Sequence, residues 1–497
     1  MDALNGLLYG LSVAFEFHNL GLLLAGCLLG TLVGVLPGLG PVGAISILLP
    51  LTFQLPPAGA IIMLAGIYNG AMYGGSTTSI LINVPGEAAS AVTCLDGYAM
   101  ARKGRAGTAL GIAVFGSFIA GTVGLIGLQL IGGPLSVLAL KFGPPEYFAI
   151  ILMGFTFIVY LAQGSMIKAV LMALAGILLS LIGLDPITSE QRFTFGNIHL
   201  FEGLSVVPLA IGLFGLAEVF VNLEKTAPAR VLQVKIKNMF PNKSQWLRAR
   251  WAIVRGTVIG FFMGILPGGG PVLSTFMAYG VEKRVSKHPE KFGHGAIEGV
   301  AAPESANNAA ASTSFIPLMT LGIPPNVVLA VLFGAFMIHG VTPGPLLMTQ
   351  HPEIFWGVIA SMYMGNVILL ILNLPLIPLW VQVLRIPDKI LYPLIVLFCL
   401  LGAYSVHNSV FDIGVMLLFG MVGYLLNKFD FEPAPLVLGF VLGPLFEVNL
   451  RRSLLMSQGS FAIFVERPIA LVALIVCVIL IILPFIQAIR KTSRPIS

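Results

Sequence analysis

Long apolar runs recur along almost the whole chain, and they decide what it can fold into. A membrane-spanning helix needs about 20 mainly apolar residues. Runs suited to this lie at residues 19–36, 57–75, 107–131, 146–163, 166–184, 204–223, 353–379, 391–406, 411–427 and 468–489. Further apolar stretches, less uniform, lie at 252–281, 296–340 and 434–450. Only 10% of the 497 residues are charged, whereas a soluble domain has about 25%. We therefore predict an all-α polytopic membrane protein with about 10–12 transmembrane helices.

Basic residues gather in short segments between these runs, at 102–105, 225–255, 283–291 and 490–494. The positive-inside rule places all of these segments in the cytoplasm. The net charge of +6 is thus a topology signal, and we predict no nucleic-acid partner. Arg451 and Arg452 do not fit the positive-inside rule, since they would lie on the outer side of the membrane if 434–450 spans it. No Lys or Arg precedes Arg102, so no cleavable signal peptide is visible.

One segment between two basic stretches is too short to cross twice. Only 27 residues separate Arg255 from Lys283, whereas two crossings need about 40. Its midpoint reads LPGGGP at 266–271. Each arm of about 11 residues would make a helix of roughly 16 Å. This predicts a re-entrant helical hairpin with its tip near the middle of the membrane.

The same motif occurs earlier as LPGLGP at 36–41, so the residue numbers of the two copies differ by 230. A hydroxyl cluster and then a proline step follow each copy, at 76–79 and Pro85 in the first half and at 312–314 and Pro324 in the second. Recurrence in this order indicates an internal duplication of about 235 residues. We align the polar run 302–309 roughly with 68–75.

Only the second tip has basic flanks, so the two hairpins are predicted to enter from opposite faces, as inverted-topology repeats. The predicted organisation is a first repeat with following spans (1–223), a basic cytoplasmic linker (224–255), and a second repeat with following spans (256–497).

Broken helices at membrane depth point to a binding site. Irregular backbone is tolerated there only where it is buried in protein or lines a water-filled cavity. Free carbonyls coordinate cations, and helix N-termini attract anions. The predicted substrate-binding residues are Asn69, Ser76, Thr77, Thr78, Ser79, Asn307, Asn308, Ser312, Thr313 and Ser314. The predicted cation-binding residues are Pro37, Gly38, Gly40, Pro267, Gly268, Gly270 and Glu304. Apart from a transported sodium ion, no metal site is predicted.

Other polar residues have a simpler interpretation. Ser, Thr and Asn often bond between membrane helices, and we interpret Asn366 and Asn373 in this way. A carboxylate inside an apolar region is usually functional, so Glu304 is a candidate for cation or proton coupling. Glu87 and Asp96 are assigned to the loop that leads to Arg102. The sequence has no HExxH or GxGD motif, and we predict that the protein is not an enzyme.

Several motifs resemble the large membrane subunit of bacterial tripartite tricarboxylate transporters. They are the paired LPGLGP and LPGGGP, YGGSTTSILINVPGE from 73, DPITSEQRFTFG at 185–196, GLFGLAEVF at 212–220 and APESANNAAASTSFIPLMTLGIPP at 302–325. The resemblance covers essentially the whole chain.

This resemblance implies a multi-pass permease of the bacterial cytoplasmic membrane. It implies as partners a small membrane subunit of about four spans and a periplasmic solute-binding protein. The implied substrate is citrate, another tricarboxylate or a related organic acid. A Na⁺ or H⁺ gradient would drive import, without a cofactor. The alternative is an ion or solute channel that does not depend on a binding protein.

Overall fold

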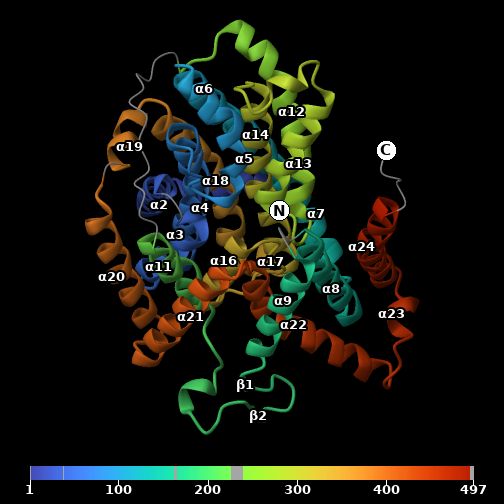
Figure 1. Ribbon diagram of the computed structural model, residues 1–497. Coiled ribbons are helices and arrows are strands. Elements are labelled where there is room, and N and C mark those ends of the chain that lie inside the picture. The colour runs from blue at the N-terminus through green and yellow to red at the C-terminus, as the bar shows by residue number, and fades with distance from the viewer. Residues whose placement is uncertain (1, 37–38, 162–164, 225–238, 385, 493–497) are drawn as a thin grey trace.

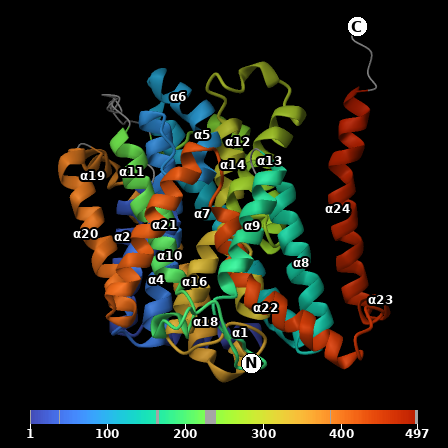
Figure 2. The same ribbon diagram turned by 60° about the horizontal axis from the view of Figure 1, so that its bottom comes forward.

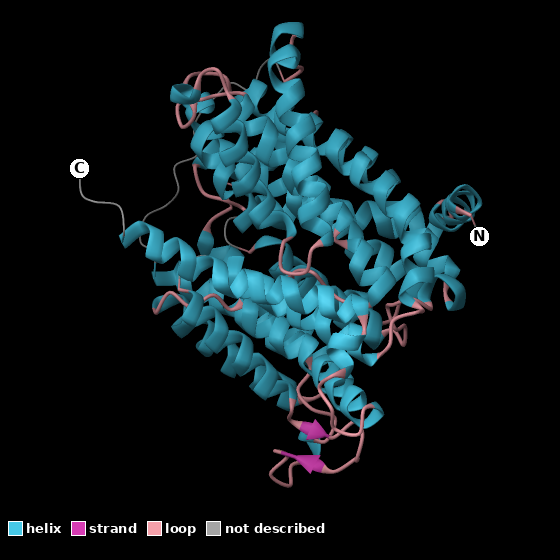
Figure 3. Ribbon diagram, turned by 90° about the vertical axis from the view of Figure 1, so that its right-hand side faces the viewer, coloured by secondary structure: helices cyan, strands magenta, loops and turns pink. Residues whose placement is uncertain are grey.

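The computed structural model describes residues 2–36, 39–161, 165–224, 239–384 and 386–492. Most of this part of the chain is helical, as Figure 3 shows. The only strands among the described residues are β1 (Gly183–Leu184) and β2 (Gln191–Arg192), which pair antiparallel in one short hairpin. The predicted all-α class is confirmed.

Seven helical segments of the described chain are long and apolar enough to cross a membrane. They are α2 (Phe17–Val35), α7 (Ala106–Ala139), the run α10 (Val206–Ala210), η5 (Ile211–Leu216) and α11 (Ala217–Glu224), α18 (Pro352–Asn373), α20 (Asp388–His407), α21 (Val410–Lys428) and α22 (Ala434–Met456). Shorter apolar segments lie in α1 (Ala3–Ala14), α3 (Gly40–Leu48) with η1 (Leu49–Thr52), α8 (Pro144–Leu161), α9 (Met166–Ser180), α16 (Val327–Ile338) and α24 (Pro468–Thr492). A polytopic membrane fold is therefore confirmed, and ten to twelve crossings would require several of the shorter segments.

The remaining helices connect these segments or fill the interior (Figure 1). They are α4 (Pro57–Ile82), η2 (Ala88–Ser90), α5 (Ala91–Thr93), η3 (Cys94–Tyr98), α6 (Ala99–Arg102), η4 (Ile198–Leu200), α12 (Lys243–Ile265), α13 (Gly270–Val285), η6 (Pro289–Lys291), α14 (Glu298–Thr313), α15 (Phe315–Leu321), α17 (Leu347–Gln350), α19 (Ile377–Val383) and α23 (Ile463–Glu466).

The LPGGGP motif at 266–271 separates the two arms of a helical hairpin, as predicted. Helix α12 ends at Ile265 and α13 begins at Gly270, whose φ of +65° favours glycine. Both arms are longer than predicted, at 23 and 16 residues. The reason is that both helices continue through the basic stretches that flank the apolar segment. At the first motif, α2 ends at Val35 and α3 begins at Gly40, again with a positive φ of +57°.

Helix α4 packs closely against α2 through glycine. All but three of its 26 residues are buried, which makes it a core helix rather than a lipid-facing one. Three α2 glycines face it at four-residue intervals, and a Cβ atom on any of them would collide with an α4 carbonyl group. These glycines are Gly26, Gly30 and Gly34, and the carbonyls belong to Met63, Ile67 and Ala71. The backbones of the two helices are therefore in direct contact, as in small-residue membrane helix packing.

Helices α12 and α14 repeat this arrangement in the second half. Here the glycines are Gly256, Gly260 and Gly264, and the facing carbonyls belong to Ala302, Ala306 and Ala310. The residue numbers of corresponding glycines differ by 230, as for Gly30 and Gly260, and those of the facing residues differ by 239, as for Ile67 and Ala306. The repeated packing supports the predicted duplication. The opposite orientation of the two halves stays a prediction.

Arg451, which does not fit the positive-inside rule, belongs to a cluster of ion pairs. Its Nη1 atom lies 2.7 Å from Asp185 Oδ2 and 3.0 Å from Glu447 Oε1. Arg192 of the β1–β2 hairpin contacts the same two acids. The cluster holds two cations and two anions and ties the end of α22 to the hairpin.

Asp185 is the centre of this cluster, and its environment favours the ionised form. Burial alone would raise the pKa of this carboxyl. Two effects outweigh burial: the backbone N–H groups of Thr188 and Ile187 donate hydrogen bonds to the carboxylate, and Arg451 and Arg192 lie beside it. Together they hold the pKa of Asp185 well below its usual range. A depressed pKa contributes stability that is present above the unfolded-state value and is lost only as pH falls through the folded-state value. The hairpin therefore keeps these contacts at neutral pH.

At the other edge of the molecule, α24 stands apart from the main bundle in Figure 2. It contacts α8 and α23, and large apolar side chains such as Val472 and Val478 are more than half exposed. Helix α24 thus presents an apolar face outward, as a membrane-embedded helix does.

Cysteine labelling tests the topology of the second hairpin. Arg250 and Lys283 lie on its two arms, and both are exposed. In a cysteine-free background, single cysteines at these positions should both react with an impermeant maleimide from the cytoplasmic side. A cysteine at Ser189, exposed on the β1–β2 hairpin, should react from the opposite side. Labelling of positions 250 and 283 from different sides would rule out the re-entrant hairpin.

Candidate functional site

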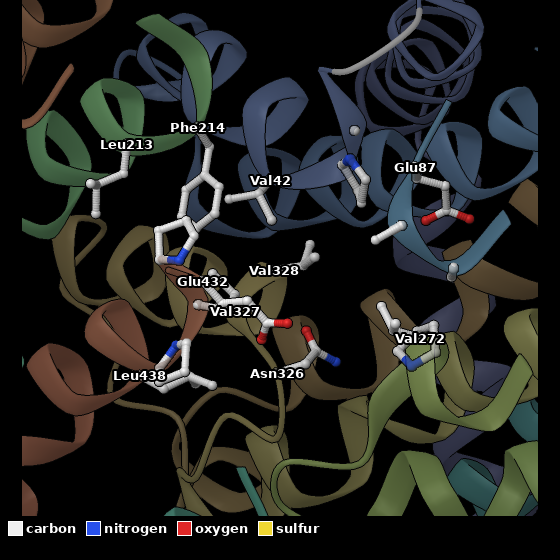
Figure 4. Close-up of a pocket in the computed structure, with 18 of the residues that line it drawn as sticks. Val42, Glu87, Leu213, Phe214, Val272, Asn326, Val327, Val328, Glu432 and Leu438 are labelled. Atoms are coloured by element: carbon white, nitrogen blue, oxygen red, sulfur yellow. The ribbon is translucent and has the colours of Figure 1, made fainter. Parts of the chain in front are cut away.

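Both broken helices contribute to one cavity of about 550 Å³. The first break supplies residues 39–42, and the second supplies Gly268, Gly269 and residues 271–273. Both proline steps also line it, through residues 85–87 and 325–327. Figure 4 shows Glu87 and Asn326 at this cavity together with Val42 and Val272. Four segments that the predicted duplication relates therefore meet at one place, and the cavity is of the size that binds small molecules.

Three helix N-termini line the cavity. Helix α3 begins at Gly40, α13 at Gly270 and α16 at Val327, and residues of the first turn of each are in the wall. Asn326 caps α16, where its Oδ1 accepts the N–H of Leu329 at 3.1 Å. The N-terminus of a helix carries a partial positive charge and free N–H groups. The cavity therefore offers sites for the oxygens of an anion.

The rest of the wall is mostly apolar. It comes mainly from η5, α11, α21 and α22, with Leu213, Phe214 and Leu438 among the residues labelled in Figure 4. Among the described lining residues, three are glutamates and none is Lys, Arg or His: Glu87, Glu218 and Glu432. An anionic ligand here must be compensated by helix ends or by cations that bind with it.

Glu87 is the most buried of these three glutamates. It follows the first proline step and is 6% exposed. Its Oε1 accepts the Nδ2–H of Asn307 at 2.8 Å. Gly75 makes room for it, because a Cβ there would lie 2.6 Å from Glu87 Cγ. The carboxylate thus links the first half to the second at the cavity wall.

Asn307 and Tyr68 have polar atoms that are buried without a partner. Both residues are completely buried, and neither Asn307 Oδ1 nor the Tyr68 hydroxyl makes a hydrogen bond of standard geometry. The Tyr68 hydroxyl lies near the side chain of Asn326. The residue numbers of Tyr68 and Asn307 differ by 239, as do those of Glu87 and Asn326. In each half, a residue of a helix therefore approaches the loop of the other half. The offset of 239 also corrects the rough alignment of 68–75 with 302–309, which corresponds to an offset of 234.

Glu304 lies deeper in the protein and is 1% exposed. Its two oxygens accept hydrogen bonds from Ser76 Oγ at 2.6 Å and from Thr93 Oγ1 at 2.5 Å. It does not line the cavity. Its charge is therefore met by two hydroxyl donors from the first half.

The predicted substrate-binding residues lie behind the cavity wall rather than in it. None of Asn69, Ser76, Thr77, Thr78, Ser79, Asn307, Asn308, Ser312, Thr313 and Ser314 lines the cavity. Three of them make hydrogen bonds to wall residues. Asn307 bonds Glu87, and the Oγ of Ser314 accepts Asn326 Nδ2–H at 3.2 Å. Ser76 Oγ donates to the carbonyl of Met72 at 3.4 Å.

Several of the other hydroxyls and amides make internal bonds. Ser79 Oγ donates to Ser90 Oγ, and Thr313 Oγ1 donates to the carbonyl of Ala309. Asn308 donates to Ser117 Oγ on α7 at 2.7 Å. The Ser79 and Asn308 bonds join different helical segments, whereas the Thr313 bond lies within α14. The part of these residues in binding stays a prediction.

Of the predicted cation-binding residues, Gly40 and Gly268 line the cavity, whereas Pro267, Gly270 and Glu304 do not. Pro37 and Gly38 lie outside the described residues. Among the described residues there is no cluster of three or more His, Cys, Asp and Glu side chains that could hold a metal ion.

Sequence reasoning missed Glu87, Asn326 and Tyr68 as site residues. A signal for two of them was available. The residue numbers of Pro85 and Pro324 differ by 239, so aligning the proline steps places Glu87 opposite Asn326. Nothing in the sequence indicates that Tyr68 approaches Asn326, because that contact depends on how the halves pack.

A multi-pass membrane fold with two broken helices around one cavity is the architecture of secondary transporters. The comparisons with known proteins agree with this class. The sequence matches the tripartite tricarboxylate transporter TctA family over residues 20–438. The chain belongs to this family.

Two relatives come from Agrobacterium vitis. One, described as an uncharacterized 52.8 kDa protein in the TAR-I ttuC' 3' region, is 51% identical over 493 residues, which cover 99% of this chain and 98% of the relative. The other, described as an uncharacterized protein in the TAR-II ttuC' 3' region, is 56% identical over 234 residues, covering 46% of this chain and 97% of the relative. No solved structure matches the chain.

Proposed function

We propose that this chain is the membrane subunit through which a small organic carboxylate, such as citrate or another tricarboxylate, is imported. A gradient of Na⁺ or H⁺ drives the import. The chain acts in the bacterial cytoplasmic membrane with a small membrane subunit of about four spans and a periplasmic solute-binding protein. Membership of a tripartite tricarboxylate transporter family supports this proposal.

One observation carries the proposal, namely that helix N-termini and carboxylates share one cavity wall. The starts of α3, α13 and α16 suit carboxylate oxygens, and Glu87 suits a cation. An anion and a cation bound together stabilise each other, so each raises the affinity for the other by the same factor. This reciprocal stabilisation is the physical basis of symport. Among the described lining residues, no basic side chain is present that could bind the anion alone.

The dependence on a binding protein is tested by reconstitution. The chain and the small membrane subunit are placed in proteoliposomes with an inward cation gradient. A thermal-shift screen of the partner binding protein first identifies the carboxylate to be used in radiolabelled form. Uptake should be saturable with the binding protein outside and should fall at least tenfold without it. Equal uptake without the binding protein, or without any gradient, would instead support a channel.

A further inference from the structure

We propose that a monovalent metal cation of the size of sodium binds between Glu87 and Asn307, with the Tyr68 hydroxyl beside it. This site rests on the proposed function in one respect, since it identifies where the coupling cation would bind. Oxygen ligands are what such hard cations prefer, and the three side chains come from α4, from the first proline step and from α14.

Unsatisfied oxygens supply the first argument. Asn307 Oδ1 and the Tyr68 hydroxyl are buried without hydrogen-bond partners. A buried polar atom left unpaired is costly, and in native proteins such atoms often mark a site for an ion or water. Asn307 is bonded to Glu87 through its Nδ2 atom, and the Tyr68 hydroxyl lies near Asn326, which lines the same cavity as Glu87. Two of the six unpaired buried atoms of the described chain therefore belong to residues next to this part of the cavity wall.

The distance between Glu87 and Asn307 supplies the second argument. A half-turn of the Asn307 amide exchanges its oxygen and nitrogen. Its Oδ1 would then lie about as far from Glu87 Oε1 as Nδ2 does now, which is 2.8 Å. Oxygens that bind one hard cation at about 2.3–2.6 Å lie roughly 3 Å apart. This side-chain rotation would bring the oxygen that is now unpaired to Glu87, where a cation would be its partner, and would convert the hydrogen bond into a pair of ligands.

The number of carboxylates at the site indicates the charge of the cation that it would bind. Glu87 is the only carboxylate bonded to Asn307 among the described residues, and both oxygens of Glu304 are occupied by Ser76 and Thr93. Divalent cations in proteins usually take several carboxylates, and the described chain contains no acidic cluster of that kind. One carboxylate with neutral oxygens balances a single positive charge.

The site is tested with sodium alone, on the purified full-length protein in nanodiscs. Unfolding temperature is measured as NaCl replaces choline chloride at constant ionic strength. A ligand that binds only the folded state raises this temperature in a saturable way. We expect such a rise for the wild type. Glu87→Gln and Asn307→Ala should raise the half-saturating sodium concentration at least tenfold.

Asn373→Ala is the matched control. Asn373 is also a fully buried asparagine whose Oδ1 has no partner, but its Nδ2 donates to the carbonyl of Leu369 rather than to Glu87. This variant should keep the wild-type response to sodium. Should Glu87→Gln fail to fold, equilibrium binding of ²²Na⁺ to the wild type and to Glu87→Asp replaces it, with saturable binding expected in both.

Three results would overturn the proposal. They are no saturable sodium response in the wild type, a response that persists in both site variants, and stabilisation by protons in place of sodium that Glu87→Gln abolishes. Neither substrate nor binding protein is present in this experiment. A failure of carboxylate uptake would therefore not affect it, and a failure of sodium binding would leave carboxylate import to be judged by the reconstitution.

Discussion

Replacing Gly30 by leucine is expected to prevent the protein from accumulating in a folded form. A Cβ atom at this position would collide with the carbonyl group of Ile67. The obstacle is the backbone of α4, which cannot rotate away as a side chain can. Overpacking of a core costs about 1–3 kcal/mol or more, and here it would separate two helices whose backbones are in direct contact. We expect destabilisation of at least about 3 kcal/mol, measured as loss of monodisperse protein in detergent and a lowered unfolding temperature.

Gly21→Leu is the control on the same helix. A Cβ atom added at Gly21 would have no neighbouring atom within 4 Å, and leucine is a better helix former than glycine. This variant should express and unfold like the wild type. If Gly30→Leu were as stable as Gly21→Leu, close glycine packing between α2 and α4 would not hold the first half together.

Replacing Asn307 by alanine is expected to reduce carboxylate uptake roughly ten- to hundredfold. The change removes the hydrogen bond to Glu87 Oε1 and leaves a buried carboxylate without that partner. Bonds to charged groups are worth about 1.5–3 kcal/mol, and each 1.4 kcal/mol corresponds to about a tenfold change. Initial uptake rates are measured in the reconstituted system with the binding protein present.

Asn373→Ala separates this effect from general loss of packing. Asn373 bonds the carbonyl of Leu369 within its own helix. This variant should lose less than about threefold in rate, the effect of a few tenths of a kcal/mol. All variants must elute as the wild type does on size exclusion. Normal uptake by Asn307→Ala would move the site away from Glu87.

The apolar runs, the two breaks and the duplication could all be predicted from the sequence. These features are local, because about 20 apolar residues make a span wherever they occur, and LPGGGP ends a helix in almost any context. A recurring motif is likewise visible without knowledge of what it packs against. For this reason the class of protein followed from the residues alone.

The residues that share the cavity were decided only by the tertiary structure. The residue numbers of the matching glycines in α2 and α12 differ by 230, but those of the residues they pack against differ by 239. A single alignment of the halves therefore cannot place both sides of the site. An alignment based on the sequence alone pairs hydroxyl clusters that do not line the cavity. From the sequence, Glu87 is interpreted as a residue of a connecting loop and not as a site residue. Direct backbone contact between the helices, which small side chains permit, brings Glu87 to Asn307 across 220 residues of sequence. The sequence determined that the chain breaks two helices within a membrane, and packing between its halves determined which oxygens meet there.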